Sequence, residues 1–304
     1  MKSSPRTHER AAAPGSNLAS LYANGLSHGE FGALAALIRE RAGIRLVPSK
    51  KGLLEGRLRK RLIALGLSSF SAYCALVLEP RASEDEIGRM IDAVTTNKTD
   101  FFREPAHFPF LTGVALPLLL AQDGASSPLR ERALTFWSAA CSSGEEVYTL
   151  AMVLAEALRT GQRFRPTILG TDICRDVLVT AKRAIYPEAS VAPVPLALRE
   201  RYLLRSKSRE DGLVRIAPAL RAQTRFSQVN LLSLSNGPRQ ADVIFCRNVL
   251  IYFDRPTQHR VLSGLCRALP QGGYLFLGHS DSVTGLDLPL EPLIPSVYRK
   301  RGPP

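Results

Sequence analysis

The chain has few of the residues that form crosslinks or bind metal ions. Its 304 residues include five cysteines, an odd number, and no two of them form a C-x-x-C pair. This spacing argues against both a disulfide framework and a zinc site, and it fits a reducing compartment. We therefore expect no metal site and a cytoplasmic location.

Long apolar runs are also missing. The most apolar stretch, residues 111–121, is interrupted by Gly113 and Pro117. It is far below the roughly 20 residues that a membrane-spanning helix needs. The start of the chain, residues 1–15, is polar and lacks the apolar centre of a secretory signal. We expect a soluble protein with no membrane insertion.

Acidic residues are scarce relative to basic ones. The chain has 40 Lys and Arg against 27 Asp and Glu, a formal net charge of +13. Such a protein should be attracted to something acidic, and nucleic acid, an anionic membrane and an acidic protein all remain open on this ground. The excess of positive charge is concentrated between Arg45 and Arg61, a segment with seven basic residues and a single acidic one, Glu55.

The hydrophobic pattern divides the chain into segments. A content of 45% apolar residues is enough for buried cores, and the length predicts about two domains. Residues 1–25 lack periodicity and predict a flexible leader. Residues 26–95 have helical periodicity and predict a small all-helical domain. Residues 96–125 predict a linker and a helix.

Residues 126–304 alternate short apolar runs with helical stretches. Strands are expected over residues 133–138, 167–170, 224–229, 241–245 and 274–277. This alternation is typical of a parallel, doubly wound α/β sheet. Ligands of such sheets bind beyond the carboxyl ends of the strands. Residues 188–224 interrupt the rhythm and predict an inserted β-hairpin.

Polar residues follow several of these predicted strands. The turn Ala139-Ala-Cys-Ser-Ser-Gly-Glu-Glu146 leads into a helix, whose N-terminus favours an anionic group. Asp172 closes the second strand, where a carboxylate can bind both hydroxyls of a ribose. Asn230 and the segment 246–253 follow two further strands. Each feature alone has an ordinary explanation as a cap, a turn or a helix-dipole partner, but together they favour an adenosine-type ligand.

The segment Thr95-Thr-Asn-Lys-Thr-Asp-Phe-Phe-Arg-Glu104 lies between the helical and the sheet regions. Taken alone, its two aromatic residues beside Arg103, framed by Asn97 and Thr99, would predict an ordinary capped helix start.

Five motifs together resemble the CheR-type methyltransferases of bacterial chemotaxis. They are Thr95–Glu104, Trp137-Ser-Ala-Ala-Cys-Ser-Ser-Gly-Glu-Glu146, Phe226–Leu231, Phe245-Cys-Arg-Asn-Val-Leu-Ile-Tyr-Phe253 and Gly278-His-Ser280. They occur in the family's order over about residues 27–300, which makes the resemblance much more specific than a sheet with a glycine turn. It implies a Rossmann-like methyltransferase sheet, a small N-terminal helical domain and an inserted β-subdomain.

The resemblance also implies an activity. It is that of a protein-glutamate O-methyltransferase, which forms glutamate methyl esters on methyl-accepting chemotaxis receptors during adaptation. The cofactor would be S-adenosyl-L-methionine and the product S-adenosyl-L-homocysteine. The partner would be the acidic cytoplasmic helix bundle of the receptor, and no nucleic acid is expected.

Matching positions carry the family's site residues. The cofactor residues would be Asn97, Thr99, Arg103, Glu145, Asp172, Asn230, Leu231, Cys246 and Arg247. Arg103, beside the transferred methyl group, and Tyr252 would be catalytic. Glu145 is expected to hold the methionine or ribose end, with Glu146 as the alternative.

The sequence departs from the family at a few positions. Cys141 stands where a smaller residue is usual, and Val147 stands where proline is common. Some members dock a receptor C-terminal peptide on the β-subdomain. The loop residues 206–208 lack the glycines expected for this, so docking stays open here.

An acidic substrate would give the basic segment between Arg45 and Arg61 a function in binding. Arg57, Arg59 and Arg61 are expected to face the receptor and speed the encounter, although a solvated helix face is the ordinary alternative.

Three other functions are each consistent with part of the sequence. A nucleic-acid methyltransferase would also be basic, but the chain lacks an N/D-P-P-Y motif and a Pro-Cys nucleophile. A nicotinamide dehydrogenase should show a fuller glycine fingerprint. A regulatory or scaffold protein that binds the cofactor without turnover remains an alternative.

Overall fold

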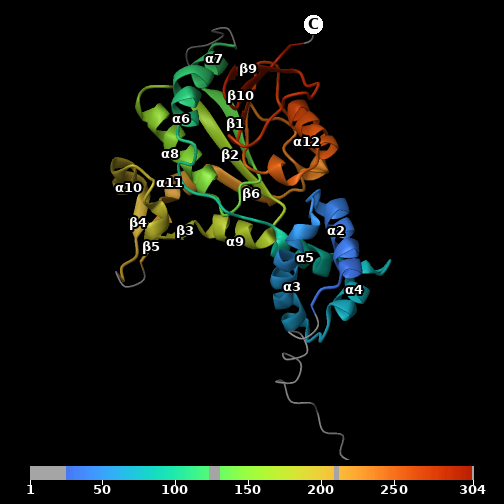
Figure 1. Cartoon of the computed structure of the whole chain (residues 1–304). Coiled ribbons are helices and arrows are strands. Elements are labelled where there is room, and N and C mark those ends of the chain that lie inside the picture. The colour runs from blue at the N-terminus through green and yellow to red at the C-terminus, as the bar shows by residue number, and fades with distance from the viewer. Residues whose placement is uncertain (1–24, 123–130, 209–211, 303–304) are drawn as a thin grey trace, which may run out of the picture. The chain divides into compact units, whose positions relative to one another are not determined.

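The computed structural model describes residues 25–122, 131–208 and 212–302, which belong to two compact units (Figure 1). The first unit runs to Arg41 and resumes over Arg45–Val94, and the second comprises Ala42–Ile44 and the chain from Thr95 onward. The predicted leader lies, up to residue 24, outside the described residues.

The described part of the first unit is helical. Its elements are α2 (His28–Ala42), the 3-10 turn η1 (Pro48–Lys50), α3 (Lys51–Leu65), α4 (Phe70–Leu78) and α5 (Glu84–Val94). A capping box starts α2, since Oγ of Ser27 accepts from the N–H of Glu30 and the carboxylate of Glu30 accepts from the N–H of Ser27, at 3.2 and 2.8 Å. Gly66 ends α3 with a left-handed φ of 67°.

The second unit is built on a seven-stranded sheet of order β6-β2-β1-β7-β8-β10-β9. Its strands are β1 (Arg132–Ala139), β2 (Phe164–Asp172), β6 (Thr224–Gln228), β7 (Val243–Cys246), β8 (Tyr274–Leu277), β9 (Leu290–Ile294) and β10 (Val297–Lys300). The strands from β6 to β8 are parallel, which confirms the predicted α/β class.

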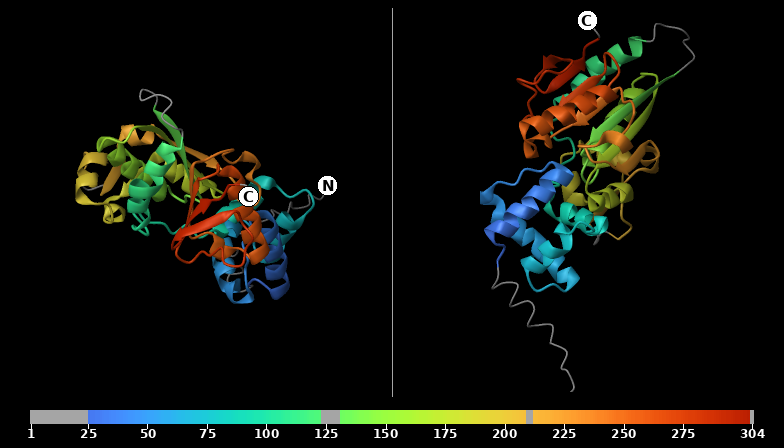
Figure 2. Two further views of the ribbon diagram at one scale, coloured as in Figure 1. Left: turned by 90° about the horizontal axis from the view of Figure 1, so that it is seen from above. Right: turned by 90° about the vertical axis from the view of Figure 1, so that its right-hand side faces the viewer.

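An antiparallel hairpin, β9–β10, completes the sheet beyond β8 (Figure 2). It was not predicted from the sequence. Four of the five residues of β9 are exposed and one of them is Pro292, so the strand lacks the alternation of apolar and polar residues that marks a half-buried strand.

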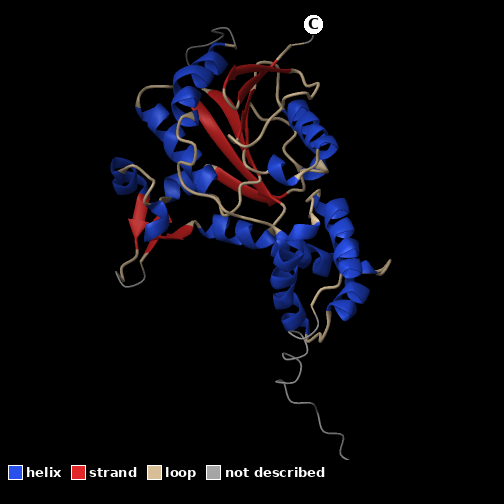
Figure 3. Cartoon of the chain, viewed as in Figure 1, coloured by secondary structure: helices blue, strands red, loops and turns tan. Residues whose placement is uncertain are grey.

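Helices cover both faces of the sheet (Figure 3). The helical elements of the second unit are α6 (His107–Phe110), the π-helical turn η2 (Leu111–Ala115), α7 (Leu116–Ala121), α8 (Glu145–Arg159), α9 (Arg175–Arg183), η3 (Glu188–Val191), α10 (Leu196–Tyr202), α11 (Pro218–Arg221), η5 (Leu234–Asn236), η6 (Leu250–Tyr252) and α12 (Arg255–Ala268).

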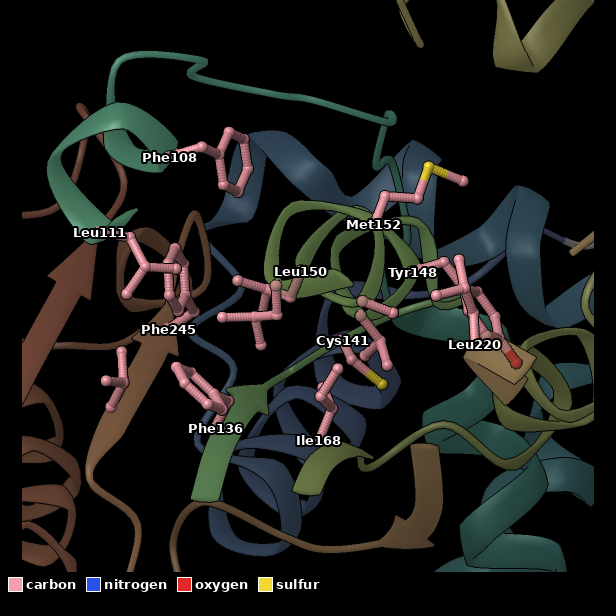
Figure 4. Close-up of a cluster of buried hydrophobic side chains, with 14 of the residues drawn as sticks. Phe108, Leu111, Phe136, Cys141, Tyr148, Leu150, Met152, Ile168, Leu220 and Phe245 are labelled. Atoms are coloured by element: carbon pink, nitrogen blue, oxygen red, sulfur yellow. The ribbon is translucent and has the colours of Figure 1, made fainter. Parts of the chain in front are cut away.

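Successive strand residues pack into two separate cores. Phe136 and Phe245 join Leu150 of α8 and the helices around Phe108 in one core (Figure 4). The adjacent residues Trp137 and Ile244 point to the opposite face and pack with α12. A sheet buried on both faces fixes the carboxyl ends of its strands, where the candidate site lies.

The inserted segment is a separate three-stranded sheet of order β3-β5-β4. Its strands are β3 (Ile185–Pro187), β4 (Leu203–Arg205) and β5 (Leu213–Ile216). The predicted hairpin corresponds to β4 and β5. The sheet also includes β3, which lies before the expected boundary at residue 188 and is too short to show a strand pattern.

Among the described residues, no single helix is long and apolar enough to cross a membrane. Only the stretch Pro48–Leu65 with Phe70–Leu78, bent by 82°, passes that test as a pair, by length and composition alone.

Candidate active site

The turn between β1 and α8 follows a tightly wound path. Ala140, Ser142 and Gly144 all have positive φ values, of 62°, 50° and 96°. A Cβ at Gly144 would lie 2.9 Å from the Cβ of Ala181 and 3.0 Å from Oη of Tyr186, so only glycine fits there. The turn places the N-terminus of α8 at the carboxyl edge of the sheet.

Asp172, at the end of β2, ties this edge together. Its Oδ2 accepts from the N–H of Ser142 at 2.8 Å, and its Oδ1 accepts from the N–H of Cys174 at 2.9 Å. Its carbonyl oxygen accepts from the N–H of Val229 at 2.9 Å. The side chain is therefore a buried link between the turns that follow β1 and β2, which is more than the simple turn or cap that its position alone suggested.

Asn97 joins the same group through Ser142. Oγ of Ser142 donates to the carbonyl oxygen of Asn97 at 2.8 Å, and the Asn97 side-chain amide lies 3.5 Å from Sγ of Cys174. Two predicted cofactor residues, Asn97 and Asp172, thus share Ser142 as a common partner. Thr99 lies two residues further along and is half-buried.

The segment from Thr95 to Ala106 is not a helix, so the alternative of a capped helix start is wrong. The physical reason lies in its backbone, because Phe102 and Glu104 have φ values of 54° and 51°, which an α-helix does not allow. The helix α6 begins only at His107.

Glu145 and Glu146 open α8 side by side but have different partners. The Glu145 carboxylate accepts from Oγ of Ser143 at 2.7 and 2.9 Å. Burial raises its pKa, against the effect of that hydrogen bond. Glu146 accepts from Oγ of Ser138 at 2.6 Å and from Nη1 of Arg247 at 3.2 Å, and burial raises its pKa as well. Glu146 is engaged inside the protein, which favours Glu145 as the residue that meets a ligand.

Arg247 lies at the centre of a second group. Its Nε lies 3.2 Å from Oε2 of Glu104, its Nη1 donates to Glu146, and its Nη2 donates to the backbone carbonyl of Arg103. The Arg247 side chain is only 3% exposed. Arg103 itself is half-buried, and its Nη1 donates to the carbonyl of Lys98 at 3.2 Å.

The remaining predicted residues lie along the same edge of the sheet. Asn230 follows β6, and its Oδ1 accepts from the N–H of Leu232 at 3.0 Å, while Leu231 is buried. The Cys246 side chain is fully buried in the core beneath α12. Tyr252 ends η6 and is half-buried. No hydrogen bond joins Tyr252 to Arg103 in the described part of the chain.

Sequence reasoning gave no role to several residues that the structure brings into this site. They are Glu104, Ser142, Ser143, Asn248 and His279. All five lie inside the motifs quoted above, so the motifs marked their importance but not their partners.

The basic segment divides by exposure within the first unit. Arg61 is paired with Glu86, with 3.0 Å between Nε and Oε1, while Arg59 is paired with Glu55 and Arg57 donates to the carbonyl of Val94. These three predicted substrate residues are partly buried and already bonded inside their own unit. Exposed cations of the same segment are Arg45, Lys50 and Lys60.

The polar side chains at the carboxyl edge of the sheet fit S-adenosyl-L-methionine. A buried carboxylate such as Glu145, whose charge is disfavoured by burial, is stabilised by an ammonium or sulfonium cation placed beside it. Asp172 offers carboxylate oxygens suited to hydroxyl donors, and the Asn230 amide is of the type that pairs with an adenine edge. Among the described residues, no group of His, Cys, Asp or Glu is arranged to hold a metal ion.

A cavity of about 310 Å³ lies elsewhere, in the inserted sheet. Glu188, Leu196, Arg199 and Leu203 are among its lining residues. No predicted catalytic or cofactor residue lines it.

Comparisons with known proteins agree with the motifs. The family model described as "CheR methyltransferase, SAM binding domain" matches residues 97–293, and "CheR methyltransferase, all-alpha domain" matches residues 29–95. The resemblance noted in the sequence is thereby confirmed.

Curated relatives match most of the chain. A chemotaxis protein methyltransferase of Klebsiella aerogenes is 39% identical over 259 residues, which cover 84% of this chain and 84% of the relative. That of Salmonella typhimurium is 38% identical and covers 86% of each chain. Among solved structures, a SAM-dependent methyltransferase from Methanosarcina mazei is 20% identical with a TM-score of 0.30, covering 49% of this chain and 53% of its own.

Proposed function

Because the chain belongs to the CheR methyltransferase family, we propose that it transfers the methyl group of S-adenosyl-L-methionine to glutamate side chains of chemotaxis receptors. The chain is a methyltransferase of the chemotaxis type, and S-adenosyl-L-methionine is its cofactor. The proposal adds the acceptor: a glutamate carboxylate on a methyl-accepting receptor, converted to a methyl ester.

One structural observation carries the proposal best. Ser142 joins Asn97 to Asp172, so two residues expected at the cofactor, 75 positions apart in the chain, are held at one place on the sheet edge. Glu145 opens the helix that follows the same turn. In this proposal Asn97, Thr99, Arg103, Glu145, Asp172, Asn230 and Leu231 hold the cofactor, and Cys246 and Arg247 complete that part of the site.

The proposed chemistry needs no general base. A glutamate side chain has a reference pKa of about 4.3 and is ionised at neutral pH. S-adenosyl-L-methionine supplies an electrophilic methyl group on a cationic sulfur. The carboxylate oxygen forms the new C–O bond while the C–S bond breaks and its electron pair stays on sulfur, so no proton moves.

The protein's own residues then have to position the acceptor and exclude water. Arg103 is proposed to hold the acceptor carboxylate by its guanidinium, and Tyr252 to align it. An arginine suits this task because its planar donors match the two carboxylate oxygens.

The partner follows from the charge of the chain. A protein with a net charge of +13 is attracted to the acidic helix bundle that we propose as substrate. The basic segment of the first unit would speed the encounter, with Arg57, Arg59 and Arg61 as the residues first expected to do so. A receptor's cytoplasmic bundle also requires that this protein act in the cytoplasm.

Transfer of a labelled methyl group tests the proposal. Purified protein, labelled S-adenosyl-L-methionine and a receptor-containing membrane fraction are expected to give labelled receptor. Double-stranded DNA and RNA serve as parallel acceptors and are expected to stay unlabelled. Label in nucleic acid would support the alternative acceptor, and cofactor binding without transfer to any acceptor would support a scaffold role.

A further inference from the structure

We propose that Glu104 is a positioning residue for methyl transfer, which acts through Arg247 to fix the backbone that carries Arg103. This inference rests on the proposed function, and it assigns Glu104 a part in the catalytic step that the sequence motifs did not.

The Glu104 carboxylate accepts hydrogen bonds from residues that follow two neighbouring strands. Its Oε1 accepts from Nδ2 of Asn248 and from the backbone N–H of His279, both at 3.2 Å, and its Oε2 lies 3.2 Å from Nε of Arg247. Asn248 follows β7 and His279 follows β8. The carboxylate is 8% exposed and therefore depends on these protein donors rather than on water.

Both strand ends are shaped for this contact. Asn248 adopts a left-handed φ of 58°, a conformation that asparagine tolerates better than most residues. A Cβ at Gly278 would lie 2.5 Å from Nδ2 of Asn248, so the glycine of the Gly-His-Ser motif gives that side chain its room. The motifs that contain Asn248 and Gly278 thus both contact Glu104, although Glu104 and Asn248 are 144 positions apart in the chain.

Arg247 links the Glu104 carboxylate to the main chain of Arg103. Its guanidinium is held between Glu104 and Glu146, and Glu146 is in turn held by Ser138 of β1. The remaining terminal nitrogen donates to the Arg103 carbonyl. Charge-assisted hydrogen bonds thus connect Ser138 in the sheet, through Glu146 and Arg247, to the backbone of Arg103.

The backbone around Arg103 needs such support. Phe102 and Glu104 both have left-handed φ values, which are costly for residues other than glycine and persist only where neighbouring groups hold them. The N–H of Phe102 donates to Oγ1 of Thr149 at 3.1 Å, which fixes one side of Arg103. Glu104 and Arg247 fix the other side.

The consequence is specific to the chemical step. The Arg103 side chain is proposed to hold the acceptor carboxylate, and a displacement of about 1 Å at such a residue can cost on the order of 100-fold in rate. Loss of the Glu104 charge should therefore slow methyl transfer more than it weakens cofactor binding, because Glu104 reaches the cofactor site only through Arg247 and the Arg103 backbone.

The test compares Glu104→Gln with the wild-type full-length protein. The amide oxygen of Gln can still accept from Asn248 and His279, but the charge opposite Arg247 is gone. Single-turnover methyl transfer to receptor membranes is expected to slow by about 10- to 100-fold, with a smaller change in the Kd for S-adenosyl-L-homocysteine and the receptor KM within about threefold of wild type.

A matched control lies at the opposite ends of the strands. Asp242 is also a buried carboxylate that accepts from a backbone N–H, that of Thr135 at 2.8 Å, and lies 3.7 Å from Arg132. Asp242→Asn is expected to lower the melting temperature without slowing the single-turnover rate. The fluorescence of Trp137, the single tryptophan and fully buried, reports whether each variant keeps its core.

A double mutant separates positioning through Arg247 from general loss of stability. Glu104→Gln and Arg247→Gln are expected to be non-additive, with the double variant little slower than the slower single variant. A Glu104→Gln rate equal to wild type, or additive losses that track the melting temperature as in Asp242→Asn, would overturn the inference. Failure of the wild-type protein to label any receptor would instead refute the proposed function.

Discussion

The backbone N–H of Ser142 donates a 2.8 Å hydrogen bond to Oδ2 of Asp172, and so joins the turn after β1 to the end of β2. One carboxylate therefore organises the turns at the sheet edge and is also proposed to bind the ribose of the cofactor. These two tasks can be separated by mutation.

Asp172→Ala leaves the N–H groups of Ser142 and Cys174 without their acceptor, and it should lower the free energy of unfolding by about 2–3 kcal/mol. Asp172→Asn keeps one acceptor oxygen and should cost less stability. Both variants are expected to weaken binding of S-adenosyl-L-homocysteine by at least about tenfold, or about 1.4 kcal/mol. Calorimetric titration and thermal unfolding measure the two effects. An unchanged Kd in both variants would remove Asp172 from the cofactor site.

Glu145→Gln and Glu146→Gln should have opposite signatures. The Glu145 carboxylate accepts from Oγ of Ser143 and pairs with no arginine or lysine in a described ion pair, so its neutral variant should weaken cofactor-product binding by about tenfold with little change in melting temperature. Glu146 neutralises buried Arg247, so its variant should lose about 2 kcal/mol of stability. Calorimetry and melting curves of both variants, measured side by side, decide between them. Reversed signatures would make Glu146 the cofactor ligand.

Arg103→Ala and Tyr252→Phe are expected to slow methyl transfer, and Tyr252→Phe should leave cofactor binding intact. Loss of the Arg103 guanidinium should reduce kcat by about 100-fold, and loss of the Tyr252 hydroxyl by about 10-fold, because each is proposed to orient the acceptor. Steady-state kinetics and product-binding calorimetry check this. Full turnover in both variants would contradict the proposed catalytic roles.

Charge reversal at exposed cations tests whether the basic segment speeds the encounter with the receptor. Lys50→Glu with Lys60→Glu should raise the receptor KM about fivefold at low salt, and high salt should abolish the difference. The double variant Arg239→Glu with Arg267→Glu changes the net charge equally at exposed positions of the second unit and serves as control. Equal effects of the two pairs would point to net charge alone.

Arg61 is a poor choice for that experiment. It makes two hydrogen bonds to the Glu86 carboxylate, which also accepts from Oη of Tyr73 at 3.0 Å. We expect Arg61→Gln to destabilise the first unit by about 2 kcal/mol, so a loss of activity there would not report on receptor binding.

His107 should make the protein sensitive to acid. It is fully buried, and neither ring nitrogen has a hydrogen-bond partner among the described residues. Burial lowers its pKa from 6.5 to about 4, helped by the charges of Arg247 and His279 and opposed by Glu104. Between these two values the unfolded chain binds the proton more strongly, so stability falls as the pH drops from about 6.5 to 4.

Replacing His107 removes that dependence. His107→Phe places a ring of similar size against Phe245 and Phe276. It should reduce the loss of unfolding free energy between pH 6.5 and 4 by about 2 kcal/mol. Denaturant unfolding at several pH values measures it, and His28→Gln, at an exposed position, is the control. An unchanged slope in His107→Phe would show that other groups govern acid unfolding.

The sequence predicted the elements whose burial pattern is strong. The strand Tyr274–Leu277 was expected with these same bounds because four consecutive apolar residues are buried on both faces of the sheet. Gly66 ends α3 because glycine readily takes the left-handed conformation found there. The short strand Ile185–Pro187 and the hairpin β9–β10, whose first strand is mostly exposed, had no comparable pattern.

The site was predictable only as far as a motif marks it. Glu104 was visible in its motif, but no local pattern links it to Arg247, which lies 143 positions away. Contacts of this kind arise from the order of strands in the sheet, which places the ends of β7 and β8 side by side. The same limit explains why Arg57, Arg59 and Arg61 were chosen by charge although their side chains are bonded within their own unit.

The central claim, that a glutamate carboxylate receives the methyl group, is tested most directly by mass spectrometry of receptor peptides after incubation with the protein and S-adenosyl-L-methionine. We predict a mass gain of one methylene unit on glutamate side chains, lost again after mild alkali because esters hydrolyse there. Alkali-stable methylation on lysine, arginine or any nitrogen, or no modified glutamate despite cofactor turnover, would contradict the account.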